Sequence, residues 1–231
     1  MDFKRNINYF KKNDTLGMFG LGLLIVGSFL LWIARAVHAG VFFFISPPAI
    51  VIGFVFFIVG SSGRASENDL DACIRNATDG LETDLSDDIH YSRKIQHKIA
   101  PAYIEGYEYD DGVMIKKAKN ASLRTSKYSK SLVYVLTDRL YINKKTISLI
   151  ADEVEKSTTE ILFDGIKKIG LEGAEKDMIF GKKTFKTKPF YFAVEYGDGE
   201  KFVCPAPDNM DSADFVEALN RYLDEYRKTK E

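Results

Sequence analysis

The stretch WIARAVHAGVFFFISPPAIVIG, residues 32–53, lies in the middle of the most apolar part of this chain of 231 residues. Residues 16–60 carry a single formal charge, that of Arg35. As one helix these 45 residues would extend for roughly 68 Å, whereas a hydrocarbon core is about 30 Å thick. Two crossings fit this length and one does not. The stretch therefore predicts a transmembrane helical hairpin, with crossings at residues 16–37 and 41–60.

The turn of this hairpin is expected at RAVHAG, residues 35–40. Arg35 and His38 would end the first crossing, where basic side chains reach the headgroups, and Gly40 can adopt a turn conformation. Pro47 and Pro48 fall inside the second crossing, where each removes a backbone donor. They predict a kink, and a hinge or a re-entrant segment is the alternative.

Four glycines in the first crossing form a surface of small side chains, namely Gly17, Gly20, Gly22 and Gly27. Small residues let membrane helices approach closely. This surface predicts packing against the second crossing or, alternatively, against a second copy of the chain in a homo-oligomer.

Basic residues flank the hairpin on both outer sides. Lys4, Arg5, Lys11 and Lys12 precede it, whereas the turn holds only Arg35. Because cytoplasmic flanks carry the excess of Lys and Arg, both termini are expected in the cytoplasm. The apolar region contains no A-x-A-like signal-peptide cleavage site that is followed by a polar segment, as the N-terminus of a mature protein would be. Cys73 and Cys204 are the only cysteines, too few for a disulfide framework, so we expect two reduced thiols.

The rest of the chain divides at about residue 100. After a basic cytoplasmic segment (residues 1–15) and the hairpin, residues 61–99 predict an acidic amphipathic connector. Residues 67–88 hold eight acids and one base, and Leu70 and Ile74 begin an apolar stripe at helical spacing. The acids are expected to be solvated and, next to an anionic leaflet, to be repelled by it.

Residues 100–231 alternate between short strand patterns and turn signals. Turns are expected near residues 137–138 or 143–144, at Asp164-Gly165 and at Gly197-Asp198-Gly199. A final helical pattern follows, with Asp211 or Ser212 as its N-cap. The prediction is six or seven antiparallel strands and then one helix.

Four segments carry a resemblance to the bacterial PH-like domains, relatives of the pleckstrin-homology and GRAM folds. They are LVYVLTDRLYI (132–142), ILFDGIKKIGLE (161–172), FYFAVEYGDGEKFVC (190–204) and FVEALNRYL (215–223). The resemblance implies a bent antiparallel barrel or sandwich plugged at one end by the C-terminal helix, here in a protein of a bacterial inner or plasma membrane. Residues 144–160 are longer and more charged than is usual for such domains. Members bind lipid headgroups, peptides or proteins, so the fold alone does not assign a function.

No catalytic arrangement is recognisable in the sequence. His38, His90 and His97 pair with no acid or cysteine in a known motif, so we expect neither an enzyme nor a metal or cofactor site. Residues 89–231 hold 25 bases and 23 acids, a balance that argues against nucleic acid as a partner.

The sharpest candidate site is a basic stretch predicted to be a loop between strands, KKAKNASLRTSKYSK, residues 116–130. It holds Lys116, Lys117, Lys119, Arg124, Lys127 and Lys130 and no acid. Near an anionic leaflet each such residue contributes about 1 kcal/mol, so the stretch predicts binding of lipid headgroups or of a partner. Lys182, Lys183, Lys186 and Lys188 form a second group.

Two functions remain open. In the first, the chain is a membrane-anchored, non-catalytic binding module that recognises a protein partner or anionic headgroups at the inner leaflet. In the second, it is a subunit or scaffold of a membrane complex, and its C-terminal domain is purely structural. The aromatic residues of residues 103–141 are compatible with either.

Overall fold

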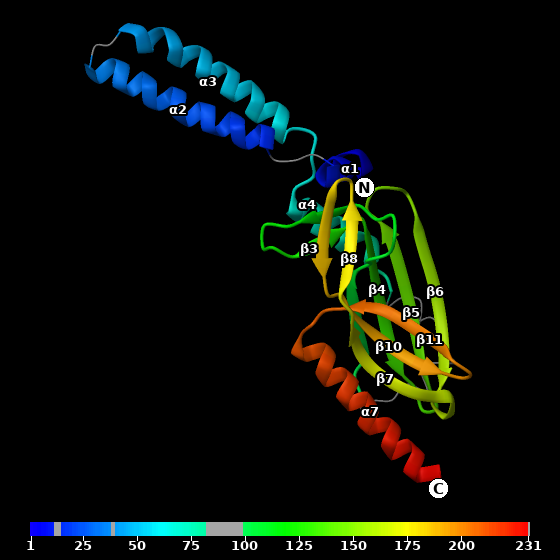
Figure 1. The fold of residues 1–231 in the computed structure, drawn as a ribbon. Coiled ribbons are helices and arrows are strands. Elements are labelled where there is room, and N and C mark those ends of the chain that lie inside the picture. Colours follow the sequence, from blue (N-terminus) through cyan, green and yellow to red (C-terminus); the bar gives the residue numbers. More distant parts are fainter. Residues whose placement is uncertain (12–14, 38–39, 82–98, 231) are drawn as a thin grey trace. The chain divides into compact units, whose positions relative to one another are not determined.

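A computed structural model describes residues 1–11, 15–37, 40–81 and 99–230. The chain forms two compact units, one of residues 2–66 and one that begins at Glu67 (Figure 1). We call them the hairpin unit and the β unit.

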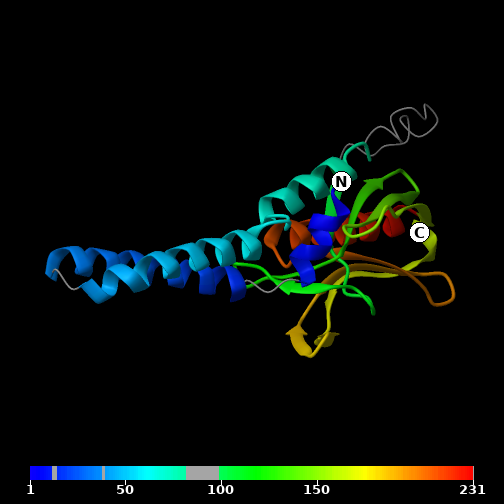
Figure 2. The same cartoon turned by 90° about the horizontal axis from the view of Figure 1, so that it is seen from above.

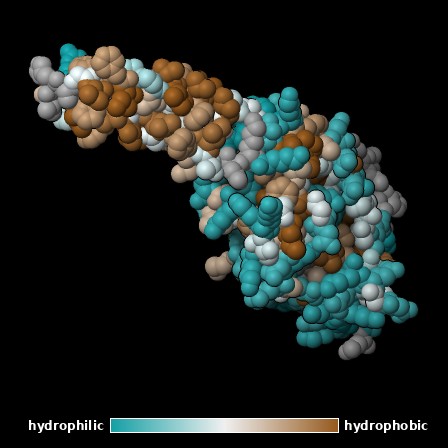
Figure 3. All heavy atoms as spheres, turned by 45° about the horizontal axis from the view of Figure 1, so that its top comes forward, coloured by the Kyte–Doolittle hydropathy of each residue, from teal (hydrophilic) through white to brown (hydrophobic). Residues whose placement is uncertain are grey.

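The hairpin unit consists of three helices, α1 (Phe3–Lys11), α2 (Thr15–Val37) and α3 (Gly40–Ser61). Two of them, over Thr15–Ala36 and Gly40–Gly60, are long and apolar enough to cross a membrane. Most of their surface is exposed and apolar, as expected for lipid-facing helices and not for helices of a soluble core (Figure 3). The prediction of two long apolar helices is therefore confirmed.

The structure places most of the residues predicted at the turn and at the kink. Arg35 lies in the exposed last turn of α2, and Gly40 begins α3. His38 lies outside the described residues. Pro47 and Pro48 are both inside α3, which continues as one helix through them. A kink at these prolines stays a prediction.

Glycines make the contact between α2 and α3 very close. A Cβ atom on Gly53 would lie 2.8 Å from the Leu24 nitrogen, and one on Gly60 would lie even closer to the Gly17 nitrogen. Gly20 and Gly27 also face α3, whereas a Cβ on Gly22 would meet nothing within 4 Å. The two helices therefore use three of the four predicted glycines to pack against each other.

We expect Gly53→Leu to separate α2 from α3, because overpacking a tight contact typically costs about 1–3 kcal/mol. The measurement is cross-linking of a Phe19→Cys/Phe56→Cys pair by a short bifunctional thiol reagent, because the rings of Phe19 on α2 and Phe56 on α3 lie 6.1 Å apart between centroids. The cross-link should form in the otherwise unaltered chain and fail to form with Gly53→Leu. The matched control is Gly22→Leu, which should leave cross-linking intact; equal loss in both variants would contradict the described packing.

The β unit begins with helix α4 (Glu67–Thr78) and ends with helix α7 (Met210–Lys230). Eleven strands lie between them among the described residues: β1 (Ala102–Tyr107), β2 (Ile115–Lys117), β3 (Leu123–Thr125), β4 (Lys127–Val135), β5 (Arg139–Ser148), β6 (Val154–Leu162), β7 (Ile166–Gly173), β8 (Lys176–Phe180), β9 (Lys183–Thr187), β10 (Phe190–Tyr196) and β11 (Glu200–Ala206). A short 3-10 turn, η1 (Phe163–Gly165), joins β6 to β7.

Seven strands form two antiparallel sheets, in the orders β1-β4-β5-β6 and β11-β10-β7. The other four form the separate hairpins β2–β3 and β8–β9. The prediction of six or seven strands therefore comes close to the seven strands of the two sheets. Of the hairpin strands, the pattern GVMIKKAK, residues 112–119, predicts β2, whereas β3, β8 and β9 were missed. Both hairpins consist of strands of three to five residues, which are too short to show a clear alternation.

Most of the expected turns lie where the sequence places them. The β4–β5 turn follows Val135, so Asn143 and Lys144 lie within β5 and the alternative turn there is wrong. Asp164 and Gly165 belong to η1, and Gly197-Asp198-Gly199 joins β10 to β11. Gly197 and Gly199 have φ angles of 52° and 99°, which glycine adopts without steric cost.

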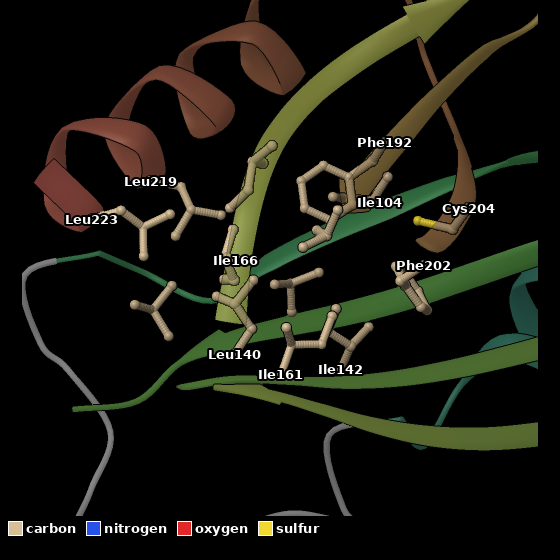
Figure 4. Close-up of a cluster of buried hydrophobic side chains, with 14 of the residues drawn as sticks. Ile104, Leu140, Ile142, Ile161, Ile166, Phe192, Phe202, Cys204, Leu219 and Leu223 are labelled. Carbon is tan, nitrogen blue, oxygen red and sulfur yellow. The ribbon is translucent and has the colours of Figure 1, made fainter. Parts of the chain in front are cut away.

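A single apolar core lies between the two sheets and α7 (Figure 4). Val133, Leu140 and Ile142 face it from the first sheet, and Phe192 and Val194 from the second, all fully buried. Leu219 and Leu223 point into it from α7. The N-cap of α7 is Asn209, whose Oδ1 accepts the Ser212 N–H at 3.0 Å, so Asp211 and Ser212 were wrong as caps.

The edge strands β1 and β11 approach each other without joining the two sheets. A Cβ on Gly106 of β1 would lie 2.9 Å from the Pro205 Cβ of β11. Proline has no N–H to donate, which weakens hydrogen bonding along this edge. The sheets stay separate, and a closed barrel is not formed.

Helix α4 packs on the outer face of the first sheet, where it contacts β5 (Figure 2). Leu132 alternates with the core residue Val133 and therefore points outward, yet it is only 1% exposed. Leu70 and Ile74, the predicted apolar stripe, are buried on α4. The helix ends at Thr78, two residues before Gly80 with its φ of 86°. The acidic segment thus begins as an integral part of the β unit.

Candidate functional site

The basic stretch is not the loop that the sequence predicts. Lys116 and Lys117 lie in β2, Arg124 in β3, and Lys127 and Lys130 in β4. Only Lys119 lies in a turn, between β2 and β3. The sequence analysis missed this because β2 and β3 have only three residues each, and the start of β4, residues 127–131, is polar apart from Tyr128.

Arg124, Lys127 and Lys130 pair with carboxylates of the described residues. Arg124 donates to both Asp71 oxygens at 2.5 and 3.2 Å, and its side chain is only 12% exposed. Lys127 lies 3.4 Å from Asp110, and Lys130 lies 3.9 Å from Glu105. The Lys130 ammonium also lies 4.5 Å from the centroid of the Tyr103 ring.

The acidic helix and the basic stretch therefore meet in space. Asp71 of α4 pairs with Arg124 of β3, and the backbone N–H of Lys119 donates to the Glu67 carboxylate at 3.0 Å. The Lys145 ammonium donates to the Asp79 carbonyl at 3.4 Å. Of these contacts only the Arg124–Asp71 pair neutralises charge that the sequence presents as a headgroup site, because the others involve a backbone N–H or a backbone carbonyl. Glu67 and Asp71 nevertheless fix α4 to the basic stretch and are not merely solvated.

A groove of about 700 Å³ runs between α4 and strands β1, β3 and β4. Its walls carry both signs of charge. They are formed by Asn68, Asp71, Ile74, Arg75, Thr78, Asp79, Glu105, Tyr107, Ser122, Arg124, Tyr128 and Lys130.

A second groove of about 530 Å³ shares four residues with the first, Glu105, Tyr107, Ser122 and Tyr128, so the two adjoin. Its further lining is rich in rings, with Tyr109, Pro189, Phe190, Pro205 and Pro207. At the junction Tyr107 and Tyr128 form an edge-to-face pair with ring centroids 5.1 Å apart. The combined groove offers flat apolar surfaces flanked by charged side chains.

Tyr109 and Tyr128 of the groove remain neutral hydrogen-bonding groups. Burial, and after it the nearby Glu105 carboxylate, raise the pKa of Tyr128 well above its usual value. Burial likewise raises the pKa of Tyr109. Both hydroxyls therefore stay protonated through the physiological range and can donate hydrogen bonds.

A polar cluster inside the sandwich was missed by the sequence reasoning. The Glu108 carboxylate accepts the Ser129 hydroxyl at 2.5 Å and lies 2.9 Å from the Lys144 ammonium. Ser129 also lies 2.7 Å from the Thr146 hydroxyl. The sequence contains an indication of this cluster, because the alternation in β4 places Ser129 and Ser131 on the same inward face as Val133 and Val135.

Cys204 lies beside this cluster and is 1% exposed. Burial raises the pKa of its thiol to about 12, an effect that Ser131 and Lys144 only partly offset. The thiol is therefore protonated and unreactive at neutral pH. Cys73 is partly exposed and forms no disulfide with it.

Within the described ranges, no group of three or more His, Cys, Asp or Glu side chains is arranged to hold a metal ion. His90 and His97, like His38, lie outside those ranges. No family model, no curated protein and no solved structure shows a significant match to this chain.

Proposed function

We propose that this chain is a membrane-anchored, non-catalytic binding module that holds an extended segment of a partner protein in the groove between α4 and β1. In this proposal α2 and α3 cross a bacterial inner or plasma membrane, and both termini lie in the cytoplasm. The basic excess on the two outer flanks supports that orientation.

The element order supports a PH-like architecture for the β unit. A four-stranded antiparallel sheet is followed by a three-stranded one and then by a C-terminal helix that covers one end of the core. This is the order that the sequence resemblance implies. The hairpins β2–β3 and β8–β9 would then be insertions into that order.

The observation that carries the proposal is the chemistry of the groove. Tyrosine and proline rings supply rigid apolar contacts, which are typical of surfaces that bind polypeptide. Two of its cations, Arg124 and Lys130, are already paired with Asp71 and Glu105, so an anionic headgroup that bound these two would have to displace existing ion pairs. A polypeptide can instead contact the rings and leave these ion pairs intact, which favours a protein partner over a lipid.

The test is photo-cross-linking of the full chain in the membranes of its source organism. A benzophenone amino acid replaces Ser122, which is exposed and lines both grooves, and in a control chain it replaces Ser157 of β6. We expect a discrete protein adduct from position 122 only. Tyr107→Ala should abolish it, because that ring lies at the junction of the grooves.

Each other result would overturn the proposal. Adducts with lipid alone would favour headgroup binding at this groove. The absence of any adduct at position 122 would favour a purely structural β unit in a membrane complex. A protein adduct that persists unchanged with Tyr107→Ala would show that the captured protein does not occupy the groove.

A further inference from the structure

The hairpin β8–β9 concentrates positive charge. Residues 176–188 hold five lysines and one aspartate, a net charge of +4. The hairpin stands out from the two sheets (Figure 2). This segment includes the second basic group in the sequence, which the groove does not explain.

One face of the hairpin is fixed to the β unit. Met178 is 4% exposed and packs with Val113 and Ile115, and Phe180 and Phe185 join this small cluster. The Lys176 ammonium donates to the Tyr109 carbonyl at 2.6 Å. The hairpin is therefore attached to the β unit by its inner face, and its outer face remains exposed to solvent.

The outer face carries an exposed apolar side chain, one cation and one carboxylate, whereas Lys183 is opposite Phe180 and shares the other face at the tip. Ile179 is 74% exposed and lies opposite Thr184. Along the strands, the next pair on the same face is Asp177 and Lys186. At the tip Gly181 has a φ of 61°, which allows a two-residue turn that presents Lys182.

The charge of the tip is not neutralised as that of residues 116–130 is. Lys182, Lys183 and Lys186 are exposed, and no carboxylate of the described residues lies within ion-pair distance of them. Arg124, Lys127 and Lys130, in contrast, each have one. Lys117 and Lys119 of the first group are exposed as well, so the difference is one of degree: the tip keeps more of its charge available for a partner.

We propose that the β8–β9 hairpin docks by its tip on an anionic bilayer surface, with Ile179 at the interface and Lys182, Lys183 and Lys186 over the headgroups. An exposed apolar side chain close to a lysine-rich tip is complementary to such a surface in both apolarity and charge. Only residues 62–66 separate α3 from α4, so the segment that connects the membrane anchor to the β unit can extend over at most about 20 Å. The inference rests on the membrane anchor of the proposed function and not on the groove.

The experiment uses the full chain in lipid nanodiscs with a spin label at Thr184→Cys, next to Ile179. Cys73→Ser removes the accessible native thiol, and Cys204 is buried. Nanodiscs of phosphatidylcholine are compared with nanodiscs that also contain phosphatidylglycerol. The measurement is accessibility to oxygen, which enters the bilayer, relative to a nickel chelate, which is excluded from it.

We expect the ratio of oxygen to nickel accessibility at position 184 to rise severalfold in the anionic nanodiscs only. High salt should abolish the rise, because screening shortens the range of the attraction to a few ångströms. Combined Lys182→Gln, Lys183→Gln and Lys186→Gln substitutions should abolish it as well. A label at Ser157→Cys on β6 is the matched control and should not respond.

Equal accessibility at position 184 in the two kinds of nanodisc would overturn the inference, as would an equal response at positions 184 and 157. A label at Ile52→Cys in α3 separates this failure from that of the anchor. It should be accessible to oxygen in both lipids; if it is not, the membrane anchor itself is wrong.

Discussion

Phe192→Ala is expected to destabilise the whole β unit by about 4 kcal/mol, within the range for removing a buried aromatic ring. Phe192 is fully buried in the core shared by both sheets and lies 6.1 Å, between ring centroids, from Phe215 of α7. Because the core is shared, the loss should reach strands that Phe192 does not pair with. The measurement is amide hydrogen exchange in β5, which should accelerate about a thousandfold if it proceeds by global opening.

Val203→Ala is the control for this prediction. Val203 lies in β11, next to Cys204, the cross-strand partner of Phe192, but it is 37% exposed. Its truncation should change exchange in β5 by less than about tenfold. If the acceleration caused by Phe192→Ala stays within β10 and β11, the two sheets do not share one cooperative core.

Lys144→Met is expected to destabilise the β unit by about 3 kcal/mol, because it would leave the Glu108 carboxylate buried without its cation. The Lys144 and Glu108 side chains are only 19% and 9% exposed. Cys204 provides the measurement, since its buried thiol is modified only when the sandwich opens. The rate of its modification in native buffer should rise by roughly a hundredfold.

Two further variants make this prediction specific. Glu108→Leu combined with Lys144→Met removes both charges, and it should recover much of the lost stability. Lys168→Met breaks an exposed ion pair with Glu172, whose atoms lie 3.5 Å apart, and should cost less than about 1 kcal/mol. Equal effects of Lys144→Met and Lys168→Met would contradict a structural role for the buried pair.

Much of the fold follows from local patterns. The uninterrupted apolarity of residues 16–60 predicts two helices, because their length exceeds one crossing. The alternation in residues 190–204 and the intervening Gly197-Asp198-Gly199 predict the β10–β11 hairpin and its turn. These features depend on neighbouring residues, so the sequence reveals them without knowledge of long-range contacts.

The candidate site was predicted less well. The basic residues of β2, β3 and β4 were identified, but their charge was expected to be free for a ligand. Asp71 precedes Arg124 by 53 positions, and no local pattern indicates that the two meet. Likewise, the exposed lysines of residues 182–188 look no different in sequence from those of residues 116–130.

By itself, the sequence determined the apolar helical hairpin, the antiparallel strands of the two sheets and the C-terminal helix, because each has a periodicity set by its own residues. Only the tertiary structure decided which charges remain available. Ion pairing depends on distances between segments far apart in the chain, such as Asp71 with Arg124 and Glu108 with Lys144. Those distances follow from the packing of α4 on the outer face of the first sheet and from the strand pairing within that sheet.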